Sequence, residues 1–242
     1  MKNNYIQKII ELRKITKFSI KLCKESLKKT KWNIKKSIKY LKNNELKKKY
    51  NEKLYNGIVY SKINKNKNIG VIIKVKTESD FITKNINFII LLKKIINISF
   101  NCVNIKEILN TKINNNKSVI EEILENKLMF KENIIIYDFV KIKTDYVNCY
   151  NHHNNKFSSI VGIKYKKKYI KVKNKIIKNI TKNIAIDIIA NNNLYKKKNI
   201  NKYYNNKKID IFFLKRINIT LEEYLNIFKK YIYIYDFNFL KI

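Results

Sequence analysis

Residues 69–83 read IGVIIKVKTESDFIT and contain the change from strand to helix that organises the chain. The run Ile69–Val75 is rich in the residues that favour strands, and so is Gly57–Ile63. The five residues Asn64–Asn68 between these runs predict a turn, so the two runs should form an antiparallel hairpin. After Thr77 the pattern changes to an apolar stripe at helical spacing, through Phe88, Leu91, Leu92, Ile95 and Ile96. A hairpin that leads directly into a helix predicts an α+β core.

Three short helices are predicted before this core. Apolar residues recur at helical spacing through residues 1–43, and each helix has one apolar stripe, so the three must pack on one another as a bundle. Ser19 is placed to cap the second helix, and Trp32-Asn33 separates the second helix from the third. Residues 44–56 are polar and rich in Lys, which predicts a linker with some helical character.

The rest of the chain predicts two related halves. Residues 105–128 indicate more helix, and Ile134–Val140 indicates a strand that completes a first subdomain, 57–143. The second subdomain, 144–242, repeats the order of strands followed by helix, with a strand at 159–165 and a helix at 176–189. We therefore predict an α+β protein in which the three-helix bundle is followed by a core of two related subdomains with antiparallel sheets.

The C-terminal part of the second subdomain contains three segments. Residues 191–208 are almost wholly Asn, Lys and Tyr and predict a solvated loop or frayed helix. Thr220 can cap a short helix over 221–230. The last residues alternate with both faces largely apolar, so we place this final strand inside a sheet and at least partly covered.

The charge of the chain follows from its composition. Lys and Arg total 54 against 18 Asp and Glu, a formal net charge of +36, yet only Arg13 and Arg216 are arginine. The lysines are accompanied by 47 Ile and 38 Asn, and all three residue types have A/T-rich codons, so we attribute most of the charge to mutational bias. A surface selected to bind phosphate would be expected to keep Arg, whose planar fork matches phosphate better than Lys does.

Composition also excludes several classes of protein. The apolar content of 45% is too high for a disordered tail, and no run of about 18 apolar residues without charge could span a membrane. The N-terminus lacks the apolar run of a leader peptide. Cys23, Cys102 and Cys149 are widely spaced, with no CxxC pair, which favours reduced thiols. We expect a cytoplasmic protein without a membrane partner.

The sequence shows no catalytic, metal or cofactor site. His152 and His153 are adjacent and, as strand neighbours, would face opposite ways, which favours a loop feature or a contact residue over a metal pair. Three glycines cannot build a phosphate-binding loop. We expect a binding protein that needs no cofactor, and not an enzyme.

The segment Ser79-Asp80-Phe81-Ile82 allows two interpretations. Ser79 or Asp80 can cap the following helix while Phe81 belongs to the core. Alternatively, Asp80 and Phe81 form an exposed pair at the junction of two elements, where contact residues gather. The residues alone leave both interpretations open.

Ordered motifs run through nearly the whole chain and resemble those of bacterial elongation factor Ts. The family's Thr-Asp-Phe-Val corresponds to Ser79–Ile82, its Gly-Glu-Asn-Ile to Lys131–Ile134, and its Tyr-x-His to Tyr150-Asn151-His152. All three glycines fall where the family has glycine. The other matches are Leu12-Arg13, Thr16, Cys23-Lys24, Leu27, Asn56-Gly57-Ile58 and Val161-Gly162-Ile163.

Of four departures from the family pattern, which include Leu22 for Asp and Lys76-Thr77 for Asn-Cys, two bear on the fold. The family's Thr-Gly-Ala in the first turn of the bundle is here Thr16-Lys17-Phe18, so this turn should differ. Relatives often carry a helical hairpin after the position of Ala190, and here we expect it to be absent or vestigial near 191–208.

The resemblance implies a guanine-nucleotide exchange factor of translation elongation in the cytoplasm. Its partner would be elongation factor Tu, GDP-bound or nucleotide-free, and it would promote GDP release by displacing Mg²⁺ and opening the nucleotide site. By resemblance, Phe81 is a wedge that enters the GTPase domain, Asp80 helps to displace the region that supports Mg²⁺, and Ser79 and Ile82 hold the pair. The resemblance also implies contacts by Lys24 and His152, and a bundle with the fold of ubiquitin-associated domains.

The charge supports a second hypothesis, a basic RNA-binding or ribosome-associated protein. This hypothesis predicts RNA affinity that falls steeply with salt and does not depend on Phe81. A net charge of +36 would give any fold weak nonspecific affinity for nucleic acid, so only the dependence on Phe81 separates the two hypotheses.

Overall fold

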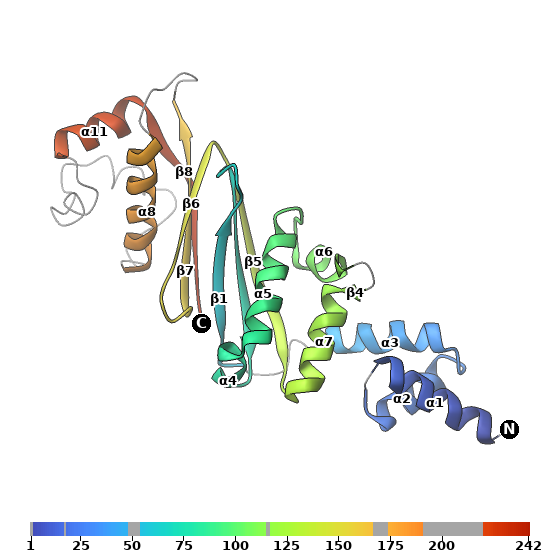
Figure 1. The fold of residues 1–242 in the computed structure, drawn as a ribbon. Coiled ribbons are helices and arrows are strands. Elements are labelled where there is room, and N and C mark those ends of the chain that lie inside the picture. The colour runs from blue at the N-terminus through green and yellow to red at the C-terminus, as the bar shows by residue number, and fades with distance from the viewer. Residues whose placement is uncertain (1, 17, 48–53, 115–116, 167–173, 191–219) are drawn as a thin grey trace.

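The computed structural model describes residues 2–16, 18–47, 54–114, 117–166, 174–190 and 220–242 (Figure 1). Two three-stranded antiparallel sheets form the centre, with strand orders β1-β2-β5 and β6-β7-β8. The first sheet consists of β1 (Asn56–Ile63), β2 (Ile69–Thr77) and β5 (Ile134–Lys143), and the second of β6 (Tyr146–Asn151), β7 (Phe157–Tyr165) and β8 (Ile232–Lys241). This arrangement confirms the predicted α+β class and the predicted hairpin over 57–75.

The two sheets lie face to face, and helices cover their outer faces (Figure 1). Between the sheets lie the buried side chains Val59, Ile72, Ile142, Val147 and Ile160. Because side chains alternate along a strand, Val71, Ile73 and Val75 of β2 point away from this interface into a second core under the helices. Those helices are α4 (Asp80–Lys84), α5 (Ile86–Ser99), α6 (Ile105–Asn110) and α7 (Val119–Phe130). On the second sheet, α8 (Asn174–Ala190) and α11 (Leu221–Lys230) cover a third core.

The prediction of helix over 105–128 is wrong in its middle. Helix α6 ends at Asn110, and a two-stranded ladder of β3 (Lys112–Asn114) and β4 (Lys117–Ser118) separates it from α7. The physical reason is a new helix start. The Ser118 hydroxyl and the Glu121 side chain form a capping box, which begins α7 independently of α6.

The final strand is confirmed, but its place in the sheet is not central. Within the described sheets β8 pairs with β7 alone and is therefore an edge strand. Its faces are both apolar because Ile232, Ile234 and Phe237 pack under the helices, whereas Leu240 packs against the core between the sheets. The predicted loop over 191–208 lies outside the described residues, and Thr220 caps α11 as predicted.

The N-terminal helices are α1 (Lys2–Thr16), α2 (Ile20–Lys29) and α3 (Ile34–Lys47). The Ser19 hydroxyl accepts a hydrogen bond from the Leu22 N–H at 3.3 Å, as predicted for a cap of α2. Helix α3 continues to Lys47, so its last residues fall in the range predicted as linker. The division of the chain at 44–56 stays a prediction.

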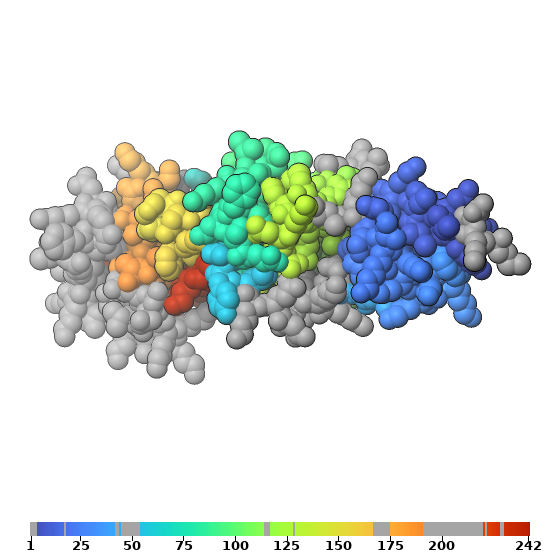
Figure 2. All heavy atoms as spheres, turned by 90° about the horizontal axis from the view of Figure 1, so that it is seen from below, coloured from blue at the N-terminus to red at the C-terminus, as the bar shows by residue number. Residues whose placement is uncertain are grey.

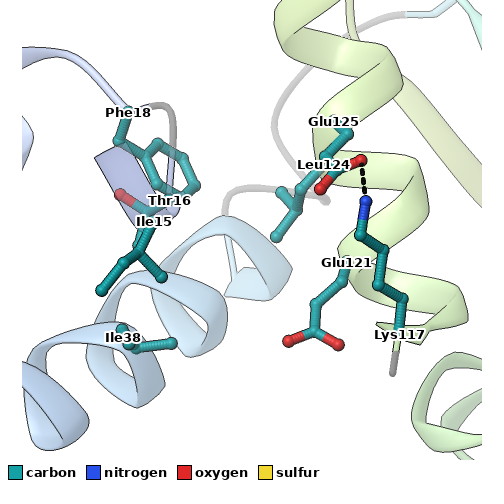
Figure 3. A pocket seen from close by; sticks show the side chains of 8 residues that line it. All are labelled: Ile15, Thr16, Phe18, Ile38, Lys117, Glu121, Leu124 and Glu125. Atoms are coloured by element: carbon teal, nitrogen blue, oxygen red, sulfur yellow. Dashed lines mark hydrogen bonds and ion pairs between the residues drawn. The ribbon is translucent and has the colours of Figure 1, made fainter. Parts of the chain in front are cut away.

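Phe18 connects the bundle to the core. Its side chain is 7% exposed and belongs to the same apolar cluster as Leu124 of α7. A pocket of about 220 Å³ lies beside this contact, with Phe18 and Ile38 on the bundle side and Leu124 and the Lys117–Glu125 ion pair on the other (Figure 3). Figure 2 shows the bundle at one end of an elongated molecule.

Candidate functional site

The segment after β2 is held by Glu132, which follows α7. Ser79 has the extended backbone of a helix cap, but its side chain makes no capping hydrogen bond. Instead, its hydroxyl donates to Glu132 Oε1 at 2.8 Å and its N–H donates to Glu132 Oε2 at 3.0 Å. The Ser79 side chain therefore joins α4 to the end of α7 and does not cap α4, although the first interpretation allowed Ser79 as the cap.

A second pair of hydrogen bonds runs in the opposite direction between the same two segments. The Glu78 Oε1 atom accepts from the Asn133 N–H at 2.9 Å and from Asn133 Nδ2 at 2.6 Å. Asn56 Nδ2 donates to the Glu78 carbonyl at 2.7 Å. Glu78 and Glu132 thus each accept two hydrogen bonds from the opposite segment. Together with the Asn56 contact, these hydrogen bonds fix the junction to β5 and β1.

Asp80 is held from the other half of the chain. Lys156, in the turn between β6 and β7, places its Nζ 2.5 Å from Asp80 Oδ1 and 3.2 Å from the carbonyl oxygen of Gly57. The Lys156 side chain is 27% exposed and that of Asp80 is 50% exposed. This ion pair brings the turn between β6 and β7 to the start of α4.

The next two residues point in opposite directions. Phe81 is 70% exposed, although Phe side chains are usually buried, whereas Ile82 is 0% exposed and belongs to the core under the helices. The buried Ile82 anchors the single turn of α4, and Phe81 projects from it into solvent. The structure therefore supports the second interpretation of the segment, an exposed aromatic residue at an element junction.

His152 is far from this junction along the chain but lies in the turn between β6 and β7, which Lys156 joins to Asp80. It follows the end of β6, and its N–H donates to the Phe157 carbonyl at 3.0 Å across the same turn that carries Lys156. The rings of His152 and His153 lie against each other with centroids 4.1 Å apart, and the pair follows the end of β6, which confirms the predicted loop feature. In such a turn, strand alternation does not apply. Among the described residues, no group of three His, Cys, Asp or Glu could hold a metal ion.

Lys24 does not belong to this cluster. It is exposed on α2 in the bundle, and Figure 1 shows α7 between that helix and α4. A hollow of about 310 Å³ connects the two regions, lined by Ser19 and Leu22 of the bundle and by Glu132 and Asn133 beside α4. Residues 79–82 therefore lie together, Lys156 joins them to the turn that carries His152, and Lys24 lies beyond the hollow.

Two of the three cysteines have thiols that burial keeps protonated. Burial raises the pKa of the Cys23 thiol and that of the Cys149 thiol, so both stay protonated and unreactive near neutral pH. All three cysteines are free of disulfides. No described helix is long and apolar enough to cross a membrane.

Comparison with known proteins identifies the family. The sequence model of the family described as "Elongation factor TS" matches residues 78–224, more than half of the chain, starting at the junction itself. The chain belongs to the elongation factor Ts family. Elongation factor Ts of Rickettsia typhi is 31% identical over 192 residues, and those of Rickettsia prowazekii and Rickettsia bellii are 30% and 27% identical.

The elongation factor Ts relatives are longer than the matched part of this chain. Each of these three matches covers 75% of the chain and 60% of the relative. The match to the family starts at Glu78, so it includes the junction, the turn with His152 and the helix that ends before Glu132. The three N-terminal helices lie outside the matched residues of the family model.

Sequence reasoning missed two residues of this region of the elongation factor Ts fold. Glu132 had a signal, since it lies in the segment Lys131–Ile134 that resembles a family motif, but nothing in the sequence connected it to Ser79. Lys156 had none, because it is one of many lysines in a chain with 54 Lys and Arg. Only the three-dimensional contact with Asp80 separates it from the others.

Proposed function

We propose that this elongation factor Ts family member is a guanine-nucleotide exchange factor that binds elongation factor Tu and promotes GDP release. The observation that carries the proposal is Phe81, an aromatic side chain 70% exposed on a turn that is fixed by Ile82, Glu132 and Lys156. The same positions match the Thr-Asp-Phe-Val motif of the family. Burial raises the pKa of the Cys23 and Cys149 thiols, so neither of these two residues supports covalent chemistry.

The proposed mechanism follows from linkage. A GTPase holds its nucleotide through phosphate contacts and Mg²⁺, so a factor that binds the empty form more tightly weakens nucleotide binding by the same factor. Burial of one Phe side chain contributes about 1.5–3 kcal/mol, and each 1.4 kcal/mol is about tenfold in affinity. Phe81, inserted between helices of the GTPase domain, would thus supply about ten- to hundredfold of the difference.

The other predicted residues have distinct roles in this proposal. Asp80 carries a negative charge beside the wedge and disturbs the region of the partner that supports Mg²⁺. Ser79 and Ile82 hold Asp80 and Phe81 in position. The hydrogen bond of Ser79 to Glu132 and the burial of Ile82 support this role. His152 contacts the partner on the same side as Phe81, and Lys24 contacts it from the bundle. The protein then acts in translation elongation in the cytoplasm.

Release of fluorescent GDP from the cognate elongation factor Tu tests the proposal. Wild type should accelerate release, and Phe81→Ala should reduce the acceleration at least tenfold without changing the melting temperature, because the side chain is exposed. Tyr235→Ala removes another exposed aromatic side chain, on β8 in the other sheet, and should leave release unchanged. No acceleration by folded wild type would reject the exchange function. An RNA affinity insensitive to Phe81 would then favour the RNA-binding alternative.

A further inference from the structure

Helix α4 cannot hold Phe81 in place by itself. It has five residues, Asp80–Lys84, and an isolated helix of that length is not stable in water. Ile82 anchors the turn on the side that follows Phe81, and the hydrogen bonds of Glu78 to Asn133 hold the chain that precedes it. The direction of Phe81 must therefore be set by contacts of the residues on either side of it.

The first contact comes from Glu132 within the same half of the chain. Both carboxylate oxygens are used, at 2.8 and 3.0 Å from the hydroxyl oxygen and backbone nitrogen of Ser79. Hydrogen bonds to an ionised carboxylate are roughly twice as strong as neutral ones, and two of them fix an orientation. Glu132 thus sets the position of the residue two places before Phe81.

The second contact comes from Lys156 in the other half. Two hydrogen bonds fix the backbone that carries the Lys156 side chain. The Lys156 carbonyl accepts from the Ile242 N–H at 3.0 Å, and the neighbouring Asn155 carbonyl accepts from the Val59 N–H at 2.8 Å. The ammonium group then joins Asp80 to the Gly57 carbonyl. Because Lys156 is 27% exposed, this pair is screened less than a fully exposed one.

We propose that Glu132 and Lys156 are positioning residues that hold Phe81 in its outward direction before the partner arrives. The proposal rests on the exchange function proposed above and deepens it. Lys156 has the more specific role, because Glu132 does not reach the turn that carries His152. Through Asp80, Lys156 joins this turn to the segment of Phe81, so that Phe81 and His152 meet the partner as one rigid surface. A surface fixed in advance loses less conformational entropy on binding than a mobile one.

The test uses Lys156→Met in the full chain, with two readouts. Amide hydrogen exchange of residues 79–84 in the free protein reports whether the segment is held, and the dependence of GDP release on factor concentration gives the maximal rate and the half-saturating concentration. We expect faster amide exchange of 79–84 and about a tenfold higher half-saturating concentration, as a loss of preorganisation requires. Global melting should be unchanged.

Three further variants make the test specific. Lys156→Arg keeps the charge and the reach to Asp80 and should restore both readouts. Glu132→Gln keeps the shape but not the charge and should affect the same two readouts. Lys164→Met removes one positive charge from β7, where Lys164 lies 3.8 Å over the ring of Tyr235, and should change neither readout.

Each outcome decides the proposal. Unchanged amide exchange of 79–84 in Lys156→Met would overturn it, whatever happens to GDP release. Faster amide exchange with unchanged or faster GDP release would also overturn the proposal. Lys156 would then hold the segment without promoting the exchange reaction, or would compete with the partner for Asp80. If wild type does not accelerate GDP release from elongation factor Tu, the exchange function and the positioning role both fail. Amide exchange of residues 79–84 would still report whether the Lys156–Asp80 contact holds the segment.

Discussion

Gly70 of β2 and Ile160 of β7 meet across the space between the two sheets. A Cβ atom on Gly70 would lie 2.3 Å from Ile160 Cδ1 and 2.6 Å from a methyl carbon of Val147, closer than carbon atoms approach in folded proteins. The two sheets therefore pack at this point because residue 70 has no side chain. This explains physically why a chain with three glycines has one here.

Gly70→Ala should destabilise the protein by about 1–3 kcal/mol, the usual range for overpacking a core. The atoms in the way belong to side chains, so the cost should fall when one of them is shortened. Gly70→Ala combined with Ile160→Val should recover part of the loss, measured by urea unfolding of both single variants and the double variant. Strict additivity of the two single effects would show that Ile160 is not the obstacle.

Phe18 provides the second stability prediction, at the contact between the bundle and α7. Its side chain is 7% exposed and lies in one cluster with Leu124. Phe18→Ala should therefore weaken the attachment of the bundle to α7 more than it destabilises the core. The loss of a buried Phe is about 3–5 kcal/mol where it is fully packed, and less here because a pocket adjoins it. Limited proteolysis should cut within the first 47 residues faster, with the core fragment surviving. Ile20→Ala, 54% exposed at the start of α2, serves as control and should not increase cutting.

Local signals in the sequence predicted local structure well. The hairpin over 57–75 and the caps Ser19 and Thr220 are all present, because turn composition and capping depend on neighbouring residues. Long-range contacts were not predictable. Nothing in the residues around Ser79 indicates that its hydroxyl would donate to Glu132, 53 positions away, rather than cap its own helix. The edge position of β8 was missed for a related reason, since apolar faces report that a strand is covered and not which strand lies beside it.

The last prediction concerns Lys131, which ends α7 immediately before Glu132. Its backbone is left-handed, with φ of 57° and ψ of 27°, a conformation that costs a residue with a Cβ about 1–2 kcal/mol and costs glycine almost nothing. The family motif that resembles this segment has Gly at this position.

Lys131→Gly should therefore raise the free energy of unfolding by about 0.5–1 kcal/mol, because relief of the strain exceeds the extra entropy that Gly gives the unfolded chain. Urea unfolding measures the change, and Lys131→Ala is the control. Ala removes the same long side chain but keeps the strained Cβ, so it should not stabilise the protein. Equal stabilisation by Ala and Gly would instead assign the effect to the loss of one positive charge from a chain of net charge +36.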